Sequence, residues 1–362
     1  MSTVLGNANE LAAEGRAFPL PPAAAANGPM RIIIVTDAWW PQVNGVVRTL
    51  TQTKGELTAM GHSVLMITPE SFRTLPCPTY PDIRLSVLPG RAVARAIAAF
   101  RPDAVHIATE GPLGWAARRH CLAQGMSFTT AYHTRFPEYI WHRMRIPLSI
   151  SYAMLRRFHR PATRIMVPTP TVKRDLEAHG FRRVVLWSRG VDTEVFEPGP
   201  RATFDDPRPI FLYVGRVAVE KNIEAFLALD LPGTKWVVGE GPQRAELEAK
   251  YPDVRYAGVM PQADLARYYD SADVFVFPSK TDTFGLVLLE AMACGLPVAA
   301  YPVTGPLDVV GDSPAAALDE DLRAACLKAL TLSRTAAREH ALRFSWASCT
   351  RQFASHLRPL SA

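Results

Sequence analysis

Short apolar runs alternate with longer amphipathic stretches along most of this chain. Runs rich in Val, Ile, Leu and Phe are typical of buried strands, and several of the stretches between them have helical spacing. This alternation predicts an α/β protein in which parallel sheets carry helices on both faces. The expected strands are Arg31–Thr36, Ser63–Thr68, Ile83–Leu88, Ala104–Ala108, Ser127–Tyr132, Arg164–Val167 and Val184–Leu186, then Ile210–Val214, Lys235–Val238, Val254–Ala257, Val274–Phe277 and Val298–Ala300.

The alternation pauses once, between 197 and 208, where Pro, Gly and Asp give the composition of a linker. The length of 362 residues is also about right for two domains. We therefore expect a disordered tail over 1–29, a first Rossmann-like domain over 30–195 and a second over 196–345. A last helix, within 346–362, is long enough to pack back onto the first domain.

Composition narrows the class of protein. Hydrophobic residues make up 48% of the chain and charged residues 20%, which indicates a folded protein. The five cysteines are scattered and never spaced C-x-x-C, so we expect no disulfide framework and no zinc site, and a reducing cytoplasm fits best. No apolar run is long enough to span a bilayer. The net charge of +6 suits an anionic ligand or an anionic surface and does not choose between them.

The most informative motif places two carboxylates, Asp282 and Glu290, around a glycine that opens a predicted helix over 284–293. The N–H groups and the dipole at a helix start favour a phosphate. Two helical turns separate the carboxylates, so they suit the two ends of a long ligand better than one small ion. Asp282 would bind a sugar hydroxyl and Glu290 a ribose. The spacing by itself equally allows a capped core helix with a buried Glu.

Other polar clusters also follow predicted strands. Ligands of open α/β sheets bind beyond the carboxyl ends of the strands, so these clusters are expected to converge on one cleft between the two lobes. They are Asp37–Gly45, His133–Pro137, Gly215–Asn222, Gly239–Pro242 and the motif with the two carboxylates.

With these motifs, the chain resembles the retaining glycosyltransferases of family four, whose GT-B fold has two Rossmann-like lobes facing each other across a cleft. The likeness covers nearly everything from Met30 onward. Asp282 stands where the family more often has Glu, which shortens the reach to the sugar by one methylene. The segment Arg189–Asp192 matches the start of the donor lobe. The resemblance implies Arg216, Lys221, His133 and Asp282 as catalytic residues and Gly45, Gly215, Arg216, Lys221, Asn222, Asp282, Phe284, Gly285, Leu286 and Glu290 as donor-binding residues.

The chemistry implied is the transfer of a sugar from a diphosphate leaving group. Arg216 and Lys221 can bracket the two phosphates, one as a bidentate fork and the other as a point charge. The family's front-face route lets the leaving phosphate help to deprotonate the acceptor hydroxyl, and Asp37 is an alternative base. We expect no metal and no cofactor, because the D-x-D of Asp319 and Asp321 is better explained as the cap of a helix.

An arginine-rich segment between 135 and 164 bears on the acceptor. Its arginines alternate with aromatic and aliphatic residues, a composition typical of a segment that lies on an anionic membrane. The alternative is a helix of the first lobe that buries Leu148, Tyr152 and Leu155. The residues predicted to dock on the membrane are Arg143, Arg145, Arg156, Arg157 and Arg160.

The motifs Asp37–Val47, Tyr132–Tyr139 and Tyr301–Pro306 are similar to those of bacterial enzymes that glycosylate diacylglycerol. This likeness favours transfer from UDP-glucose or UDP-glucuronate to diacylglycerol by a protein on the inner face of the cytoplasmic membrane. A GDP-mannose-dependent α-mannosyltransferase acting on phosphatidylinositol or a related lipid is the alternative. A non-catalytic sugar-nucleotide binder also fits. Nucleic acid is not an expected partner, because the basic residues cluster in one lobe and no nucleic-acid motif is present.

Overall fold

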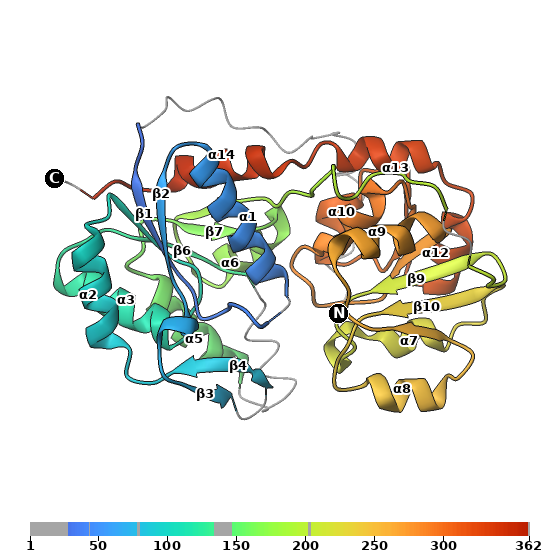
Figure 1. Ribbon diagram of the computed structural model, residues 1–362, viewed down its shortest axis with the longest axis horizontal. Coiled ribbons are helices and arrows are strands. Elements are labelled where there is room, and N and C mark those ends of the chain that lie inside the picture. The colour runs from blue at the N-terminus through green and yellow to red at the C-terminus, as the bar shows by residue number, and fades with distance from the viewer. Residues whose placement is uncertain (1–27, 43, 78–79, 134–146, 202–203, 361–362) are drawn as a thin grey trace. The chain divides into compact units, whose positions relative to one another are not determined.

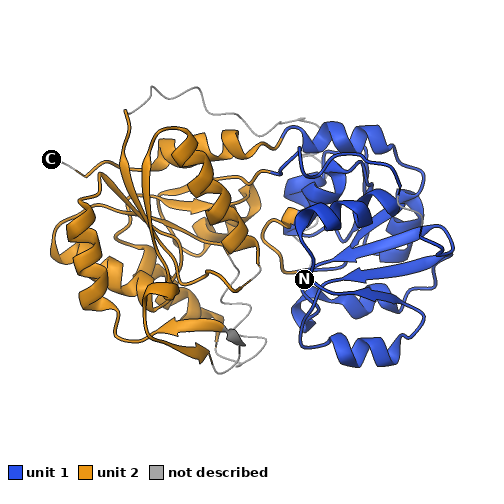
Figure 2. Cartoon of the chain, viewed as in Figure 1, with its two compact units in different colours: residues 1–24, 191–280, 287–343 blue, residues 25–190, 281–286, 344–362 orange. Residues whose placement is uncertain are grey.

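A computed structural model describes residues 28–42, 44–77, 80–133, 147–201 and 204–360 of the chain. The chain divides into two compact units (Figure 2), each described by itself below. Unit 1 comprises residues 191–280 and 287–343, and unit 2 comprises 25–190, 281–286 and 344–362. The expected tail, 1–29, lies outside the described residues except for its last two positions. The short segment Thr281–Leu286 groups with unit 2, although its sequence neighbours belong to unit 1.

Unit 2 is built on a six-stranded sheet with the order β2-β1-β5-β6-β7-β8, and all its strand pairs are parallel. Its strands are β1 (Arg31–Val35), β2 (Ser63–Ile67), β5 (Ala104–Ile107), β6 (Thr129–Ala131), β7 (Ile165–Val167) and β8 (Val184–Leu186). The strand expected at Ile83–Leu88 is not part of this sheet. It ends earlier, as β4 (Tyr80–Ser86), and pairs antiparallel with β3 (Thr74–Cys77) in a separate hairpin.

Helices cover both faces of this sheet because alternate residues of β1 point to opposite sides. Ile32 and Ile34 pack with α1 (Gly45–Ala59) and α14 (Trp346–His356), whereas Ile33 and Val35 pack with α2 (Gly90–Phe100) and α3 (Pro112–Ala123). The last helix, α14, therefore belongs to the core of unit 2, beside α1 (Figure 1). The remaining helices of this unit are α5 (Leu148–His159), α6 (Pro170–Ala178) and the 3₁₀ turn η2 (Pro69–Ser71).

Unit 1 repeats the architecture with a parallel sheet of order β11-β10-β9-β12-β13-β14. Its strands are β9 (Ile210–Val214), β10 (Thr234–Val238), β11 (Arg255–Ala257), β12 (Val274–Phe277), β13 (Val298–Ala300) and β14 (Ala316–Leu318). Its helices are α7 (Ile223–Leu227), α8 (Arg244–Lys250), α9 (Gln262–Ser271), α10 (Leu286–Ala293), α11 (Thr304–Val310), α12 (Leu322–Ala329) and α13 (Arg334–Ala341), with the 3₁₀ turn η3 (Val219–Lys221).

The α/β class with two Rossmann-like sheets is confirmed. The predicted strands of the parallel sheets differ from the observed ones by at most two residues at an end. The sequence did not reveal β14, because its Ala-Ala-Leu run lacks the β-branched residues that signal a strand. Of the helices in the described part of the chain, none has both the length and the apolar character needed to cross a membrane.

Candidate functional site

In unit 1, the turns after β9 and β10 form one backbone cluster. The N–H groups of Gly215 and Val217 donate to carbonyls at and beyond the end of β10, so the pairing of the two strands continues into their turns. A Cβ on Gly239 would lie 2.0 Å from Gly215 O, and one on Gly241 would lie 2.1 Å from Val217 O. Only glycine allows this approach. The sequence signal was a G-x-G directly after a strand, and Gly239–Pro242 is one of the clusters expected at the cleft, although none of its residues is among the predicted donor-binding residues.

The two predicted diphosphate ligands, Arg216 and Lys221, follow β9 in this unit, and both are half-buried. The carbonyl of Arg216 accepts a hydrogen bond from Tyr213 Oη at 2.9 Å, which fixes the backbone at that position. Lys221 is the last residue of η3. Both cations thus lie beyond the carboxyl end of a central strand, where the ligands of open α/β sheets bind.

Asn222 connects this turn to the strand that leads into the motif with the two carboxylates. Its backbone is left-handed, with φ 53°, a conformation that Asn tolerates better than most residues. Its Nδ2 donates to Pro278 O at 3.0 Å, just after β12. In this structure Asn222 therefore holds two strand ends together, and its predicted role in binding the donor remains a prediction.

Glu290 lies in α10, a helix whose residues are nearly all buried because the helix is apolar all round. Its side chain is 3% exposed, and its Oε2 accepts a hydrogen bond from Tyr269 Oη at 3.1 Å. A buried carboxylate needs such partners to offset the loss of hydration. This is compatible with both readings that the sequence left open, the ribose ligand and the buried core Glu.

Within unit 2 the structure brings together the segment Thr281–Leu286, the start of α1 and His133. Thr283 Oγ1 donates to His133 O at 2.8 Å. Leu286 Cδ1 would lie 3.6 Å from a Cβ built on Gly45, which is an ordinary contact. Packing in unit 2 therefore does not require glycine at position 45. Close approach to a ligand remains the predicted reason for it.

The remaining predicted donor-binding residues lie at the start of α10. Phe284 is buried, and Gly285 has a left-handed φ of 85° that favours glycine. Asp282 is half-buried in the turn before them. Gly285 thus allows the chain to reverse from this turn into the helix.

His133 is held as a neutral hydrogen-bond donor. Its Nδ1 accepts a hydrogen bond from Arg189 Nη2 at 3.1 Å, so the proton of the neutral ring must be on Nε2. Burial, together with the positive charge of Arg189, holds the pKa of His133 well below its usual value. Nε2 is shielded from solvent and has no hydrogen-bond partner among the described residues. The neutral ring therefore carries an N–H at Nε2 that no described residue accepts, and its lowered pKa makes it a poor base.

Arg189 holds His133 in place, a role that its sequence position does not reveal. It is 4% exposed, and its Nη1 donates to the carbonyls of Trp187 and Ser188. The guanidinium lies 4.3 Å from the centre of the Trp187 ring. Burial lowers its pKa to about 10, so it stays protonated at neutral pH. We had read Arg189–Asp192 as a lobe boundary, and nothing in its local sequence shows that the arginine turns inward.

A second histidine, the fully buried His106, extends this cluster. Its Nδ1 lies 2.9 Å from Thr129 Oγ1, and its ring packs edge-on against Trp187 and Phe353. Burial and the nearby Arg189 charge lower the pKa of His106 to about 3. The cluster therefore contains two neutral histidines and one cation.

Asp37, which we had considered as an alternative base, anchors the start of α3. Its carboxylate accepts hydrogen bonds from the N–H groups of Leu113 and Gly114 and from Thr109 Oγ1. Burial raises the pKa of Asp37, while these hydrogen bonds lower it. The contacts give Asp37 a structural role as a helix cap.

The predicted membrane segment is only partly described. Arg143 and Arg145 lie outside the described residues. On α5, Tyr152 and Leu155 are buried, whereas Ile150 is 59% exposed and Leu148 and Met154 are also exposed. Arg157 and Arg160 are exposed, but Arg156 donates to His179 O at 3.0 Å and is half-buried. The helix thus combines a buried face with exposed aliphatic and cationic side chains.

The D-x-D acts as expected. Asp321 Oδ1 accepts hydrogen bonds from the N–H groups of Arg323 and Ala324 and so caps α12.

Comparison with known proteins identifies the family. A family model described as Glycosyltransferase Family 4 matches residues 43–195, and one described as Glycosyl transferases group 1 matches residues 208–332. The chain is 31% identical over 308 residues to a GDP-mannose-dependent alpha-mannosyltransferase of Mycobacterium tuberculosis, covering 78% of this chain and 81% of the relative.

Two further relatives place this result in context. An alpha-monoglucosyldiacylglycerol synthase of Streptococcus pneumoniae is 26% identical over 351 residues, covering 83% of this chain and 78% of the relative. The solved structure of a sucrose-phosphate synthase from Thermosynechococcus elongatus superposes with a TM-score of 0.71 at 23% identity, covering 90% of this chain and 97% of the other, and shows the shared fold. Two parallel Rossmann-like sheets, two family matches in succession and a relative aligned over most of its length lead to one conclusion: the chain is a hexosyltransferase of glycosyltransferase family 4 with the GT-B fold.

Proposed function

We propose that this enzyme transfers a hexosyl group from a nucleotide-diphosphate sugar to a membrane lipid, with retention of configuration. The observation that carries the proposal is His133, a half-buried neutral histidine whose shielded Nε2–H has no partner among the described residues. Its carbonyl accepts a hydrogen bond from the segment that contains Asp282. Sugar hydroxyl groups both donate and accept hydrogen bonds. The Nε2–H of His133 could donate to one hydroxyl, and the carboxylate of Asp282 could accept from another.

The leaving diphosphate carries the developing negative charge, and its stabilisation is the main catalytic task. Arg216 and Lys221 would supply the opposite charge, and Glu290 would bind the ribose. The bond from the anomeric carbon to the phosphate oxygen breaks while the acceptor oxygen bonds to the same face of that carbon. The hydroxyl proton of the acceptor passes to the leaving phosphate. This route requires no carboxylate nucleophile and agrees with the capping role of Asp37.

Two donor and acceptor pairs fit the proposal. UDP-glucose or UDP-glucuronate with diacylglycerol is the pair favoured by the sequence motifs, and a relative whose name includes monoglucosyldiacylglycerol supports this acceptor. GDP-mannose with phosphatidylinositol or a related lipid is the second pair, and its donor is supported by the GDP-mannose-dependent relative.

Product analysis separates these possibilities. The purified protein is incubated with UDP-glucose, UDP-glucuronate or GDP-mannose and with vesicles containing diacylglycerol or phosphatidylinositol, and the lipid products are resolved and their anomeric configuration is determined. We expect one α-linked glycolipid. Absence of glycolipid with every pair would contradict the lipid acceptor, and tight nucleotide-sugar binding without any turnover would favour the non-catalytic binder. The R216Q/K221Q variant, which lacks the two cationic side chains predicted to bind the diphosphate, serves as the control.

We further propose that α5 contributes to peripheral docking on the anionic inner face of the cytoplasmic membrane. Exposed Ile150 and Met154 would enter the headgroup region while Arg157 and Arg160 bind anionic headgroups. Arg156 is unsuitable for a test because its side chain binds a backbone carbonyl.

Co-sedimentation with vesicles tests this docking. Binding is expected to rise with the fraction of anionic lipid and to fall in R157E/R160E. The control is R95E, which changes an exposed arginine on α2. Equal binding of wild type, R157E/R160E and R95E would contradict the proposed surface.

A further inference from the structure

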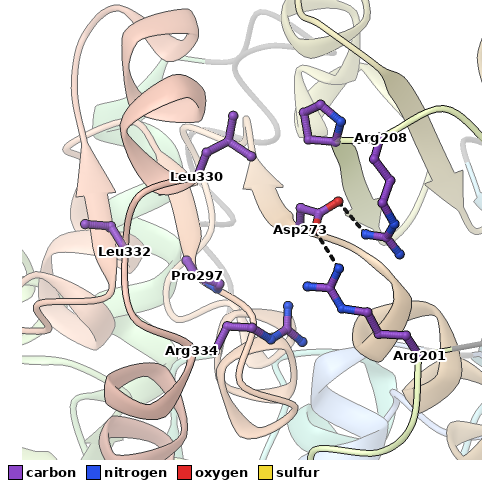
Figure 3. A pocket seen from close by; sticks show the side chains of 8 residues that line it. Arg201, Arg208, Asp273, Pro297, Leu330, Leu332 and Arg334 are labelled. Atoms are coloured by element: carbon purple, nitrogen blue, oxygen red, sulfur yellow. Dashed lines mark hydrogen bonds and ion pairs between the residues drawn. The ribbon is translucent and has the colours of Figure 1, made fainter.

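A cavity in unit 1 lies at the amino ends of the sheet strands, opposite the carboxyl ends that Arg216 and Lys221 follow. It has a volume of about 450 Å³, and three of its lining residues, Pro209, Asp273 and Pro297, immediately precede strands β9, β12 and β13. The cavity is therefore at the amino ends of these parallel strands, whereas the predicted diphosphate ligands follow the carboxyl end of β9. It is lined by Arg201, Arg208, Pro209, Asp273, Pro297, Leu330, Leu332 and Arg334 (Figure 3).

The charges in this cavity do not balance. Three arginines and one carboxylate line it. Asp273 Oδ1 pairs with Arg201 Nη1 at 3.0 Å, and Asp273 Oδ2 pairs with Arg208 Nη1 at 2.6 Å and accepts the N–H of Ile210 at 2.8 Å. Both oxygens of Asp273, the carboxylate among the described lining residues, are therefore bound by Arg201, Arg208 and the N–H of Ile210, and neither binds Arg334.

Arg334 is held in place by backbone carbonyls. It donates to Ala272 O at 3.0 Å and to Cys294 O at 3.3 Å. Figure 3 shows its guanidinium pointing toward that of Arg201. Burial lowers the pKa of Arg334 and the positive charge of Arg201 lowers it further, while the carboxylates of Asp273 and Asp270 offset part of this shift. Two like charges that face one another across a cavity are unfavourable unless an anion lies between them.

The chemistry of the lining identifies the class of anion. Guanidinium groups bind phosphate oxygens in a bidentate manner, and the three arginines of the lining outnumber its carboxylate, which favours an anion such as phosphate even with Asp270 near Arg334. Leu330, Leu332 and Pro297 form an apolar wall beside the arginines. The cavity is larger than a phosphate group and lies within the size range of small-molecule sites. Arg201 is 45% exposed, so a ligand can reach it from solvent.

We propose that this cavity, the Arg201 pocket, is a second ligand site that binds a small phosphate monoester. The phosphate lies between Arg201 and Arg334, and the organic part lies against Leu330, Leu332 and Pro297. The site is separate from the sugar-nucleotide chemistry proposed above and does not depend on it.

Calorimetric titration of the full-length protein tests the proposal. To remove competing phosphate binding at the predicted donor site, the titrations use the R216A/K221A background. Glycerol 3-phosphate, glucose 6-phosphate and inorganic phosphate serve as probes. We expect saturable 1:1 binding of at least one ester, more tightly than inorganic phosphate because only an ester also contacts the apolar wall. R201Q is expected to weaken ester binding by at least about tenfold.

Two further variants make the test specific. R323Q removes an exposed arginine of α12 that binds Asp230 O outside the pocket, and it should leave the affinity unchanged. D273N removes the competing negative charge and should tighten ester binding severalfold, provided that circular dichroism shows a native fold. Arg208 still holds Asp273 in R201Q, so this variant should also fold.

Several outcomes would overturn the proposal. Ester binding that is equal in R201Q and R323Q would exclude this pocket, and equal affinities for inorganic phosphate and both esters would exclude a monoester site. In a last experiment, binding of the wild type and of R201Q to vesicles containing phosphatidic acid is compared. If R201Q loses binding to these vesicles while no soluble ester binds, the ligand is a lipid headgroup and not a small monoester.

Discussion

The ends of the parallel strands in the two units are built in different ways. In unit 1, the turns after β9 and β10 touch through their backbones, and glycines make the contact possible, while Arg216 and Lys221 stay half-exposed. In unit 2, Asp37 and Arg189 follow strands, are buried and bind neighbouring groups. Asp37 caps a helix there, and Arg189 holds a histidine. Unit 1 thus keeps two half-exposed cations beyond a strand end, whereas unit 2 holds a histidine in one tautomer.

This difference has a consequence for substitutions. A change in the turns of unit 1 should act first on backbone geometry, because no side chain there can move aside. A change in the buried cluster of unit 2 should act through protonation and hydrogen bonding. The following variants are ordered from the largest expected effect to the smallest.

Gly239→Ala should cause the largest loss. Its φ is 143°, and the new Cβ would lie 2.0 Å from Gly215 O, so the turn after β9 must move. We expect a loss of about 3 to 4 kcal/mol in the free energy of unfolding, together with loss of donor binding. Urea denaturation and nucleotide titration measure both. Gly258→Ala is the control, since its Cβ would meet only side-chain ends, the nearest at 3.3 Å. Similar losses in both variants would contradict the special role of the glycine cluster.

Glu290→Gln should separate activity from stability. The Gln side chain can still accept the hydrogen bond from Tyr269, so the fold should remain intact. If Glu290 binds the donor, turnover should fall roughly 10²- to 10³-fold. Tyr269→Phe is the matched control, because it removes the partner and should cost about 1 kcal/mol of stability. An E290Q enzyme with wild-type turnover would assign Glu290 to the core and not to the site.

The lowered pKa values of His106 and His133 in unit 2 should make stability depend on pH. The folded-state pKa of His106 is about 3, below the unfolded value near 6.5, so the unfolded chain binds the proton first as the pH falls. Stability is therefore complete above pH 7 and decreases below about pH 6.5, by about 1.4 kcal/mol per pH unit for each such histidine. Denaturation at pH 7.5 and 5.5 measures the decrease. His106→Asn, which can still bond Thr129, should reduce the slope. An unchanged slope would show that His106 does not cause it.

Gly45→Ala should have the smallest effect on stability. A Cβ there would make an ordinary contact with Leu286, so the change in the free energy of unfolding should stay within about 0.5 kcal/mol. If phosphates approach this backbone, the KM for the donor should nevertheless rise. Initial-rate kinetics with the natural donor test this expectation. A destabilisation as large as that of Gly239→Ala would show that the two units do not differ as described.

Much of the fold follows from local sequence. All strands of the two parallel sheets except β14 were predictable, because buried strands need continuous runs of apolar, mostly β-branched or aromatic residues. The hairpin of β3 and β4 was not predictable, because Ile83 and Leu85 indicate a strand but local sequence does not show which strand it pairs with. The cap at Asp321 was predictable, since capping depends on neighbouring residues.

The sequence by itself therefore determined the α/β class, the two sheets and the identity of the charged residues that follow their strands. Tertiary structure decided which of those residues are committed to the fold. Arg189 turns inward and fixes the tautomer of His133, which is far from it in the sequence. Asp37 accepts hydrogen bonds from the first backbone N–H groups of α3. Such choices depend on burial and on hydrogen bonds between distant segments, and local composition does not contain them.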